Sequence, residues 1–278
     1  MHYDDTILEF AGDGLTLAAT AWGNAEAQPV LFFHGGGQTR RAWANVARHV
    51  GKHGSLGISF DHRGHGDSEW AADGDYFVDA FARDVERVIE AFDRPVVLVG
   101  ASRGGQASLI GGSRHQDRVR LVVMCDVAPD MAEDEVGSII DFMRASTAGF
   151  ASIDEAADAL AAYTGTPRPS DSSRLIKAMR QADGRWFWHW DPRTVSNAYL
   201  NPPEEAALMR EAAAVFRKPL VFVRAEHGSV VSDAGVEAFR ALAPQIAVET
   251  AKGAHHMFTG DSNDAFARRL LHYLATAV

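Results

Sequence analysis

The sequence predicts an α/β fold: a mostly parallel, doubly wound, eight-stranded sheet with a helical cap inserted before the last two strands. Two observations predict it. Short apolar runs alternate with longer amphipathic stretches, which is typical of a sheet covered by helices on both faces. The alternation then stops between residues 127 and 217, where the chain is Ala-rich, acidic and interrupted by prolines.

The first two apolar runs, residues 7–10 and 15–22, are separated by a Gly-Asp-Gly sequence and predict an antiparallel hairpin. The next runs are rich in β-branched and aromatic residues and apolar on both faces, as parallel strands covered on both sides are. These runs are residues 29–33, 56–60, 95–99, 119–125 and 219–223. Residues 246–250 form a weaker candidate for the last strand.

Helical spacing of apolar residues predicts a helix over residues 77–92 and a last helix from about residue 261. The strand-free segment predicts a cap over the strand ends. We therefore expect an α/β core of residues 1–127 and 215–278 and a helical cap of residues 128–214.

Composition narrows the class of protein. The chain has 278 residues, a formal net charge of −10 and one cysteine, Cys125, which excludes an intramolecular disulfide. A negative surface argues against nucleic acid and anionic membranes as partners. There is no apolar run of ~18 residues for a membrane span, and the first residues lack the basic segment of a signal peptide. We expect a cytoplasmic protein that acts on a small molecule; its oligomeric state is not indicated.

The most informative motif is G-x-S-x-G at residues 100–104, after an apolar run and before a helical pattern. Small residues two positions before and after Ser102 allow a sharp strand-to-helix turn that exposes its hydroxyl. The turn also aims the free N–H groups of a helix N-terminus at any oxyanion formed there. The context therefore predicts that Ser102 is a nucleophile.

Three further motifs follow the same order as in a known family. They are HGGG at residues 34–37, DHRGHGDS at 61–68 and GAHHM at 253–257. With the serine motif, they make the chain resemble the α/β-hydrolases, in the capped branch that includes epoxide hydrolases and carbon–carbon bond hydrolases. A serine nucleophile counts against epoxide hydrolase or haloalkane dehalogenase activity, because those relatives use Asp at that position.

The resemblance implies a set of roles. His256 would be the base that activates Ser102, with His255 as the alternative, and the backbone N–H groups of Gly36 and Arg103 would bind the oxyanion. The 61–68 segment would be an architectural turn that Arg63 braces. No tight cluster of metal ligands accompanies its histidines, and we expect neither a metal nor a cofactor.

The acid of the triad departs from the family pattern. The resemblance places an Asp after the strand that ends near residue 224, but Gly228 and Ser229 stand there. Asp126, at the end of the strand before the cap, is the preferred candidate. Glu226 is the main alternative, and Asp233 or no acid at all remain open.

The cap contains an aromatic cluster whose members either pack the cap onto the core or contact substrate. Aromatic side chains commonly line apolar pockets and leave a polar N–H for orientation. The candidates for substrate contact are Trp186, Trp188, Trp190 and Phe142, with Met143 and Phe150 as weaker ones.

These residues together predict a cofactor-free serine hydrolase. Its expected substrate is a small to medium carboxylic ester or lactone with a largely apolar acyl or aryl part. Cleavage of an amide or a carbon–carbon bond on the same triad is the first alternative. A hydrolase-like ligand-binding protein with little turnover is the second, because the usual acid is missing and the fold hosts many functions.

Overall fold

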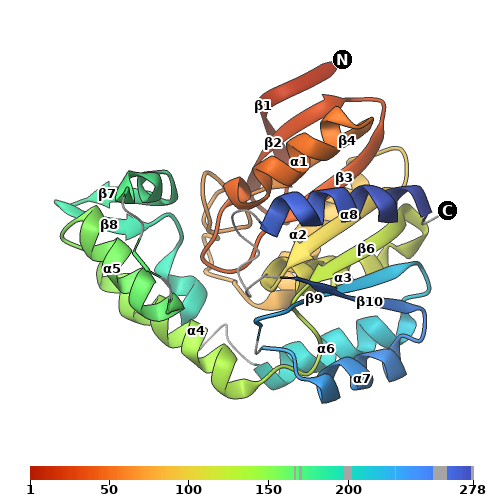
Figure 1. The fold of residues 1–278 in the computed structure, drawn as a ribbon. Helices are drawn as coiled ribbons and strands as arrows, with labels where there is room; N and C mark the ends of the chain where they lie inside the picture. Colours follow the sequence, from red (N-terminus) through yellow and green to blue (C-terminus); the bar gives the residue numbers. More distant parts are fainter. Residues whose placement is uncertain (166, 169–170, 197–201, 229, 253–261, 277–278) are drawn as a thin grey trace.

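The computed structural model describes residues 1–165, 167–168, 171–196, 202–228, 230–252 and 262–276 (Figure 1). Its main sheet has eight strands in the order β1-β2-β4-β3-β5-β6-β9-β10. The two pairs that include β2 are antiparallel, and the other pairs are parallel. The predicted fold class is confirmed.

Each predicted strand is present, with ends that differ by a few residues. β1 (His2–Ala11) and β2 (Thr16–Asn24) form the predicted hairpin. The apolar runs correspond to β3 (Gln28–Phe33), β4 (Ser55–Phe60), β5 (Val96–Ala101), β6 (Val119–Cys125), β9 (Leu220–Ala225) and β10 (Ile246–Ala251).

Helices cover both faces of the sheet, because alternate residues of the buried strands point to opposite faces. In β3, Leu31 and Phe33 belong to the apolar cluster on one face, and Val30 and Phe32 belong to the cluster on the other. The first face is covered by α2 (Val78–Glu90), α3 (Arg103–Arg114), α6 (Pro202–Val215) and α7 (Asp233–Leu242). The second is covered by α1 (Ala44–Lys52) and α8 (Ser262–Thr276).

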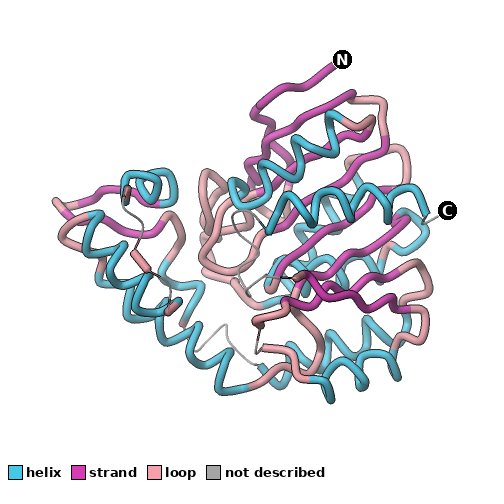
Figure 2. The backbone as a smooth tube through the Cα atoms, viewed as in Figure 1, coloured by secondary structure: helices cyan, strands magenta, loops and turns pink. Residues whose placement is uncertain are grey.

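The segment between β6 and β9 projects from the strand ends as a separate layer (Figure 2). It contains α4 (Glu133–Ala145), α5 (Ile153–Thr164), and the 3-10 helices η3 (Ser146–Ala148), η4 (Ser172–Ala178) and η5 (Pro192–Val195). Helix α6, the last element of this segment, instead packs against α3 and α7 of the core. The domain limits at residues 128 and 214 stay a prediction.

The expectation that the cap contains no strands was wrong. β7 (Met179–Ala182) and β8 (Arg185–Trp188) pair as a separate antiparallel hairpin. Asp183 and Gly184 form its turn, both with positive φ (49° and 72°), as a two-residue hairpin turn of the primed type requires. The hairpin escaped prediction because each strand has only four residues and the tryptophan-rich one does not alternate apolar with polar side chains.

The sheet register places the ends of three strands side by side. Ala101 at the end of β5 is opposite Cys125 at the end of β6, and Cys125 is opposite Val223 of β9. The residues that follow, Ser102 and Asp126, therefore leave the sheet at one edge. Such an edge, at the carboxyl ends of parallel strands, is where open α/β sheets bind ligands.

Among the helices that the structure describes, none is long and apolar enough to cross a membrane.

Candidate active site

Ser102 sits in a strained turn between β5 and α3. Its φ of 47° and ψ of −119° are unfavourable for a residue with a side chain, and such strain is concentrated at functional sites. The Ser102 N–H donates to Cys125 O (3.2 Å), and Ser102 O accepts from the N–H groups of Gly105 (2.9 Å) and Gln106 (3.0 Å). The turn is thus fixed from both sides.

Two glycines make this turn possible. A Cβ atom at Gly100 would lie 2.2 Å from Gly104 O, and one at Gly104 would lie 2.2 Å from Phe33 O. Neither position can hold a side chain without moving the backbone. The small residues of the motif are therefore required by the close approach of α3 to β5 and β3.

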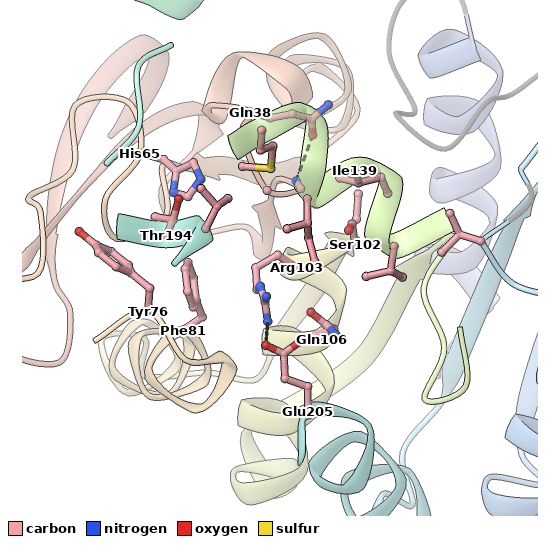
Figure 3. Close-up of a pocket in the computed structure, with 18 of the residues that line it drawn as sticks. Gln38, His65, Tyr76, Phe81, Ser102, Arg103, Gln106, Ile139, Thr194 and Glu205 are labelled. Carbon is pink, nitrogen blue, oxygen red and sulfur yellow. Dashed lines mark hydrogen bonds and ion pairs between the residues drawn. The ribbon is translucent and has the colours of Figure 1, made fainter. Parts of the chain in front are cut away.

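Ser102 lines a cavity of about 120 Å³ between the strand ends and the cap (Figure 3). Ile139 and Met143 of α4 and Tyr163 of α5 also line it. These three residues and Gly36 also line a second cavity of about 410 Å³, which extends between the core and the cap hairpin. The site is therefore one small chamber at the serine and one larger apolar chamber beside it.

The loop after β3 lies against the serine. A Cβ atom at Gly35 would be 3.4 Å from Ser102 Cβ. Gly36 lines both cavities, and its N–H donates to no acceptor in the described part of the chain. Arg103 is the first residue of α3, so its N–H has no partner within the helix. The structure brings both predicted oxyanion donors to the cavity that Ser102 lines.

Three buried histidines hold that loop in place. The His65 ring accepts a hydrogen bond at Nε2 from the Gly37 N–H (3.2 Å) and donates from Nδ1 to Arg63 O (2.9 Å). The His34 ring donates from Nδ1 to Gly35 O (2.7 Å) and accepts at Nε2 from the N–H of His62 (3.1 Å). His62 Nε2 in turn donates to His34 O (2.9 Å). Each ring of this histidine cluster has one defined tautomer, because each faces fixed partners.

The histidine cluster is uncharged near neutral pH. Burial lowers the pKa of His34 to about 4 and that of His65 to about 3, and it lowers the pKa of His62 well below its usual value. Within the described ranges no group of His, Cys, Asp and Glu side chains is arranged to hold a metal ion. The cluster therefore acts as a hydrogen-bonded support of the loop.

The 61–68 turn is braced as expected. Arg63 is buried and pairs with Asp84 of α2 (Nε to Oδ2, 2.7 Å), and it also donates to the carbonyl oxygens of Asp13 (3.2 Å) and Asp75 (3.1 Å). Asp61 forms a buried ion pair with Arg40, a partner that the sequence did not reveal.

Asp126 is fully buried directly after β6, with a φ of 49°. Its N–H donates to Val223 O (2.9 Å), and its Oδ1 accepts from the Ala225 N–H (3.0 Å). A Cβ atom at Gly228 would lie 2.6 Å from Asp126 Oδ2. The Asp126 carboxylate therefore occupies the space beside Gly228, at the position where the resemblance expects the acid.

The other acid candidates lie elsewhere. The Glu226 carboxylate is exposed and lies 3.9 Å from the His227 ring, and the exposed Asp233 pairs with Arg224. His255, His256 and Ser229 are outside the described residues. The contact between Asp126 and a histidine stays a prediction.

The aromatic residues of the cap divide into two groups. Phe142, Trp188 and Trp190 line the larger cavity, and Met143 lines both. Trp186 lines neither; it pairs by backbone hydrogen bonds with Phe150 (2.7 and 2.8 Å) inside the cap.

Sequence reasoning missed several polar residues of the smaller cavity, and Gln106 and Glu205 are the two that lie beside Arg103. Gln106 is one helical turn after Ser102 on α3, so its spacing could have indicated it. Glu205 comes from α6, and only the tertiary packing of α6 on α3 brings it there.

Comparison with known proteins identifies the family. A family model described as alpha/beta hydrolase fold matches residues 28–261. Protein phosphatase methylesterase 1 of Bos taurus is 27% identical over 168 residues, which are 58% of this chain and 44% of that protein. The chain thus spans less than half the length of this curated relative.

Another relative matches over more of its length. The 2-(acetamidomethylene)succinate hydrolase of Mesorhizobium japonicum is 26% identical over 204 residues, 72% of this chain and 71% of that protein. A crystal structure of E-2-(acetamidomethylene)succinate hydrolase superposes with a TM-score of 0.82 at 21% identity, covering 99% of this chain and all of the other.

Replacing His65 by Gln tests the histidine cluster. The buried imidazole resists protonation, so its contribution to stability is complete above about pH 6.5 and is lost as the pH falls toward its folded pKa of about 3. We expect His65→Gln, which keeps a donor and an acceptor, to reduce the acid-side slope of the free energy of unfolding by up to about 1.4 kcal/mol per pH unit. Urea unfolding at several pH values measures this slope.

The matched control is His2→Gln, a substitution of an exposed histidine on β1. We expect a smaller change of slope for it. Equal slopes in wild type and His65→Gln would contradict a neutral, buried His65.

Proposed function

Because the chain belongs to the α/β-hydrolase fold family, we propose that it is a serine hydrolase that cleaves a small to medium, largely apolar carboxylic ester or lactone through an acyl-enzyme. The observation that carries this proposal is the strained Ser102 at the head of α3, beside a cavity shared with the 34–37 loop. An ordinary turn has no need of a positive φ at a serine that opens into a cavity.

The chemistry follows from the groups at the strand ends. Ser102 Oγ attacks the substrate carbonyl carbon, and His256 takes the hydroxyl proton as the bond forms. The carbonyl oxygen becomes an oxyanion, which the Gly36 and Arg103 N–H groups stabilise. The tetrahedral intermediate collapses, the bond to the alcohol breaks, and His256 returns the proton to the leaving oxygen. Water then attacks the acyl-enzyme by the same steps and releases the acid.

Asp126 is proposed to orient His256 and to stabilise its charged form. Three facts support this assignment over Glu226 and Asp233. Asp126 is buried, it follows the strand adjacent to the nucleophile strand, and its carboxylate fills the space beside Gly228. An exposed carboxylate would be screened by water and would stabilise a histidinium ion less.

The larger cavity favours an apolar substrate. Its walls include Phe142, Leu160, Leu175, Trp188 and Trp190. Its volume of about 410 Å³ is within the usual range for small-molecule sites. An apolar acyl or aryl part gains free energy by leaving water for such walls.

Amide hydrolysis is the second candidate. The relative named 2-(acetamidomethylene)succinate hydrolase matches most of this chain, which favours including amides among the substrates tested. An assay of p-nitrophenyl esters, lactones and p-nitroanilides on the same enzyme separates the two activities.

Labelling by a fluorophosphonate probe tests the nucleophile. We expect one adduct on the wild type and none on Ser102→Ala, because the probe reacts with an activated serine. His256→Ala should lower kcat by about the same factor as Ser102→Ala, since triad members act as a unit. Labelling that persists in Ser102→Ala, or a far larger loss in His255→Ala than in His256→Ala, would contradict these assignments.

Asp126→Asn tests the acid. The substitution keeps size and removes the charge that holds the histidine, and the equivalent change in a serine protease lowers kcat by about 10⁴. We expect a loss of several orders of magnitude in kcat for ester hydrolysis. Glu226→Gln is the matched control and should retain activity; the reverse result would assign the acid to Glu226.

Trp188→Ala tests the larger cavity. We expect it to shift the relative kcat/KM across a series of acyl chain lengths by a graded amount, about tenfold or more, because contacts in an apolar pocket contribute ~1–3 kcal/mol each. Trp186→Ala is the control, since Trp186 lies in the same strand but outside the cavity. If both variants keep the wild-type profile, the tryptophans only pack the cap.

A further inference from the structure

The smaller cavity has a polar wall at the side of Ser102 formed by α3 and α6. Arg103, Gln106 and Glu205 form this wall (Figure 3). Arg103 extends from the turn beside Ser102 toward Glu205, and Gln106 lies next to that carboxylate. We call these three side chains the polar wall.

The polar wall contains a largely buried ion pair. Arg103 Nη1 lies 2.9 Å from Glu205 Oε1, and the side chains are 15% and 8% exposed. The Arg103 guanidinium also lies 5.6 Å from the centre of the Phe81 ring, which holds it over that ring.

Gln106 adds a neutral polar group to the wall. The residue is only 4% exposed, yet it borders the cavity. Its side-chain amide makes no hydrogen bond to any residue that the structure describes. A few polar groups at the border of a mostly apolar binding cavity commonly fix the orientation of a ligand, so this set of donors and acceptors points to a polar group of the ligand.

The charges of the wall decide the kind of group. Arg103 and Glu205 are the only residues with a formal charge among the described residues that line this cavity, and they cancel. A carboxylate near Arg103 would also be near Glu205, and an ammonium near Glu205 would be near Arg103. A neutral group that both accepts and donates meets neither repulsion.

We propose that the polar wall binds a carboxamide of the substrate. Its oxygen accepts from the Arg103 guanidinium, and its N–H donates to the Glu205 carboxylate or to the Gln106 amide oxygen. The substrate would then be two-armed, with the scissile carbonyl at Ser102, the carboxamide on the polar wall and an apolar part in the larger cavity. The inference rests on the proposed serine hydrolase function.

Matched esters test this recognition. The p-nitrophenyl esters of adipic acid monoamide, adipic acid and heptanoic acid end in a carboxamide, a carboxylate and an ethyl group on chains of similar length. A second series places the same three groups on the alcohol part of benzoate esters. We expect the carboxamide to give the highest kcat/KM in one of the two series, by about tenfold, which is the contribution of one or two buried hydrogen bonds.

Two variants should each weaken the preference for the carboxamide, one relative to the ethyl group and the other relative to the carboxylate. Gln106→Leu keeps size but removes the amide, so the preference for the carboxamide over the ethyl group should fall several-fold. Glu205→Gln leaves Arg103 uncompensated, so the carboxylate ester should gain about tenfold relative to the carboxamide. Glu204→Gln is the matched control, an exposed neighbour on α6, and should keep the wild-type profile. Thermal unfolding of each variant establishes that it folds.

The relative kcat/KM values of the wild type on the matched esters decide whether a carboxamide is preferred, even if a variant does not fold. Absence of a carboxamide preference in both series overturns the proposal, as does a preference that both folded variants retain unchanged. Hydrolysis of p-nitrophenyl acetate, which is too short to reach the wall, separates the two hypotheses. If the acetate is cleaved by the wild type and not by Ser102→Ala, a flat profile counts against the polar wall only. If it is not cleaved, the proposed function fails.

Discussion

The close approach of α3 to the ends of β3 and β5 is the constraint on which the site depends. Gly104 O and Phe33 O occupy the space that side chains at Gly100 and Gly104 would need. This approach forces Ser102 to a φ of 47° and turns its side chain away from the sheet toward the cavity. Both Ser102 and Arg103 owe their places in the cavity to this one backbone geometry.

A second constraint acts on the 34–37 loop, which forms another wall of the cavity at Ser102. The 34–37 loop has three glycines and little preference of its own for one conformation. The hydrogen bond from Gly37 to His65 and the exchange between His34 and His62 restrict it. These bonds require neutral rings with one tautomer each, and burial supplies that neutrality. The loop is thus held in place by hydrogen bonds with histidine rings that burial keeps neutral.

Sequence patterns predicted the features that depend on residues close together in the chain. The two-sided apolar runs predicted the five central parallel strands, the Gly-Asp-Gly turn predicted the β1–β2 hairpin, and the spacing around Ser102 predicted the turn before α3. The β7–β8 hairpin was missed because its Asp183-Gly184 turn joins strands too short to show a period. Glu205 could not be predicted at all, because it reaches the cavity only through the packing of α6 on α3. The family resemblance suggests Asp126 as the acid and leaves Glu226 and Asp233 open, and only the three-dimensional structure shows that Asp126 is buried and that its carboxylate lies beside Gly228.

The proposed position of the triad acid, Asp126, is consistent with the packing at the ends of β6 and β9. The space beside Gly228 holds one carboxylate, and a side chain at 228 would collide with the one from Asp126. A carboxylate can therefore reach this space from the residue after β6 or from the loop after β9, but the space does not hold both. Asp126 adopts a positive φ, which Asp tolerates better than most residues, so the strand end before the cap can carry it. Gly228 leaves room for the Asp126 carboxylate, so the lack of an acid at residue 228 does not argue against the proposed triad.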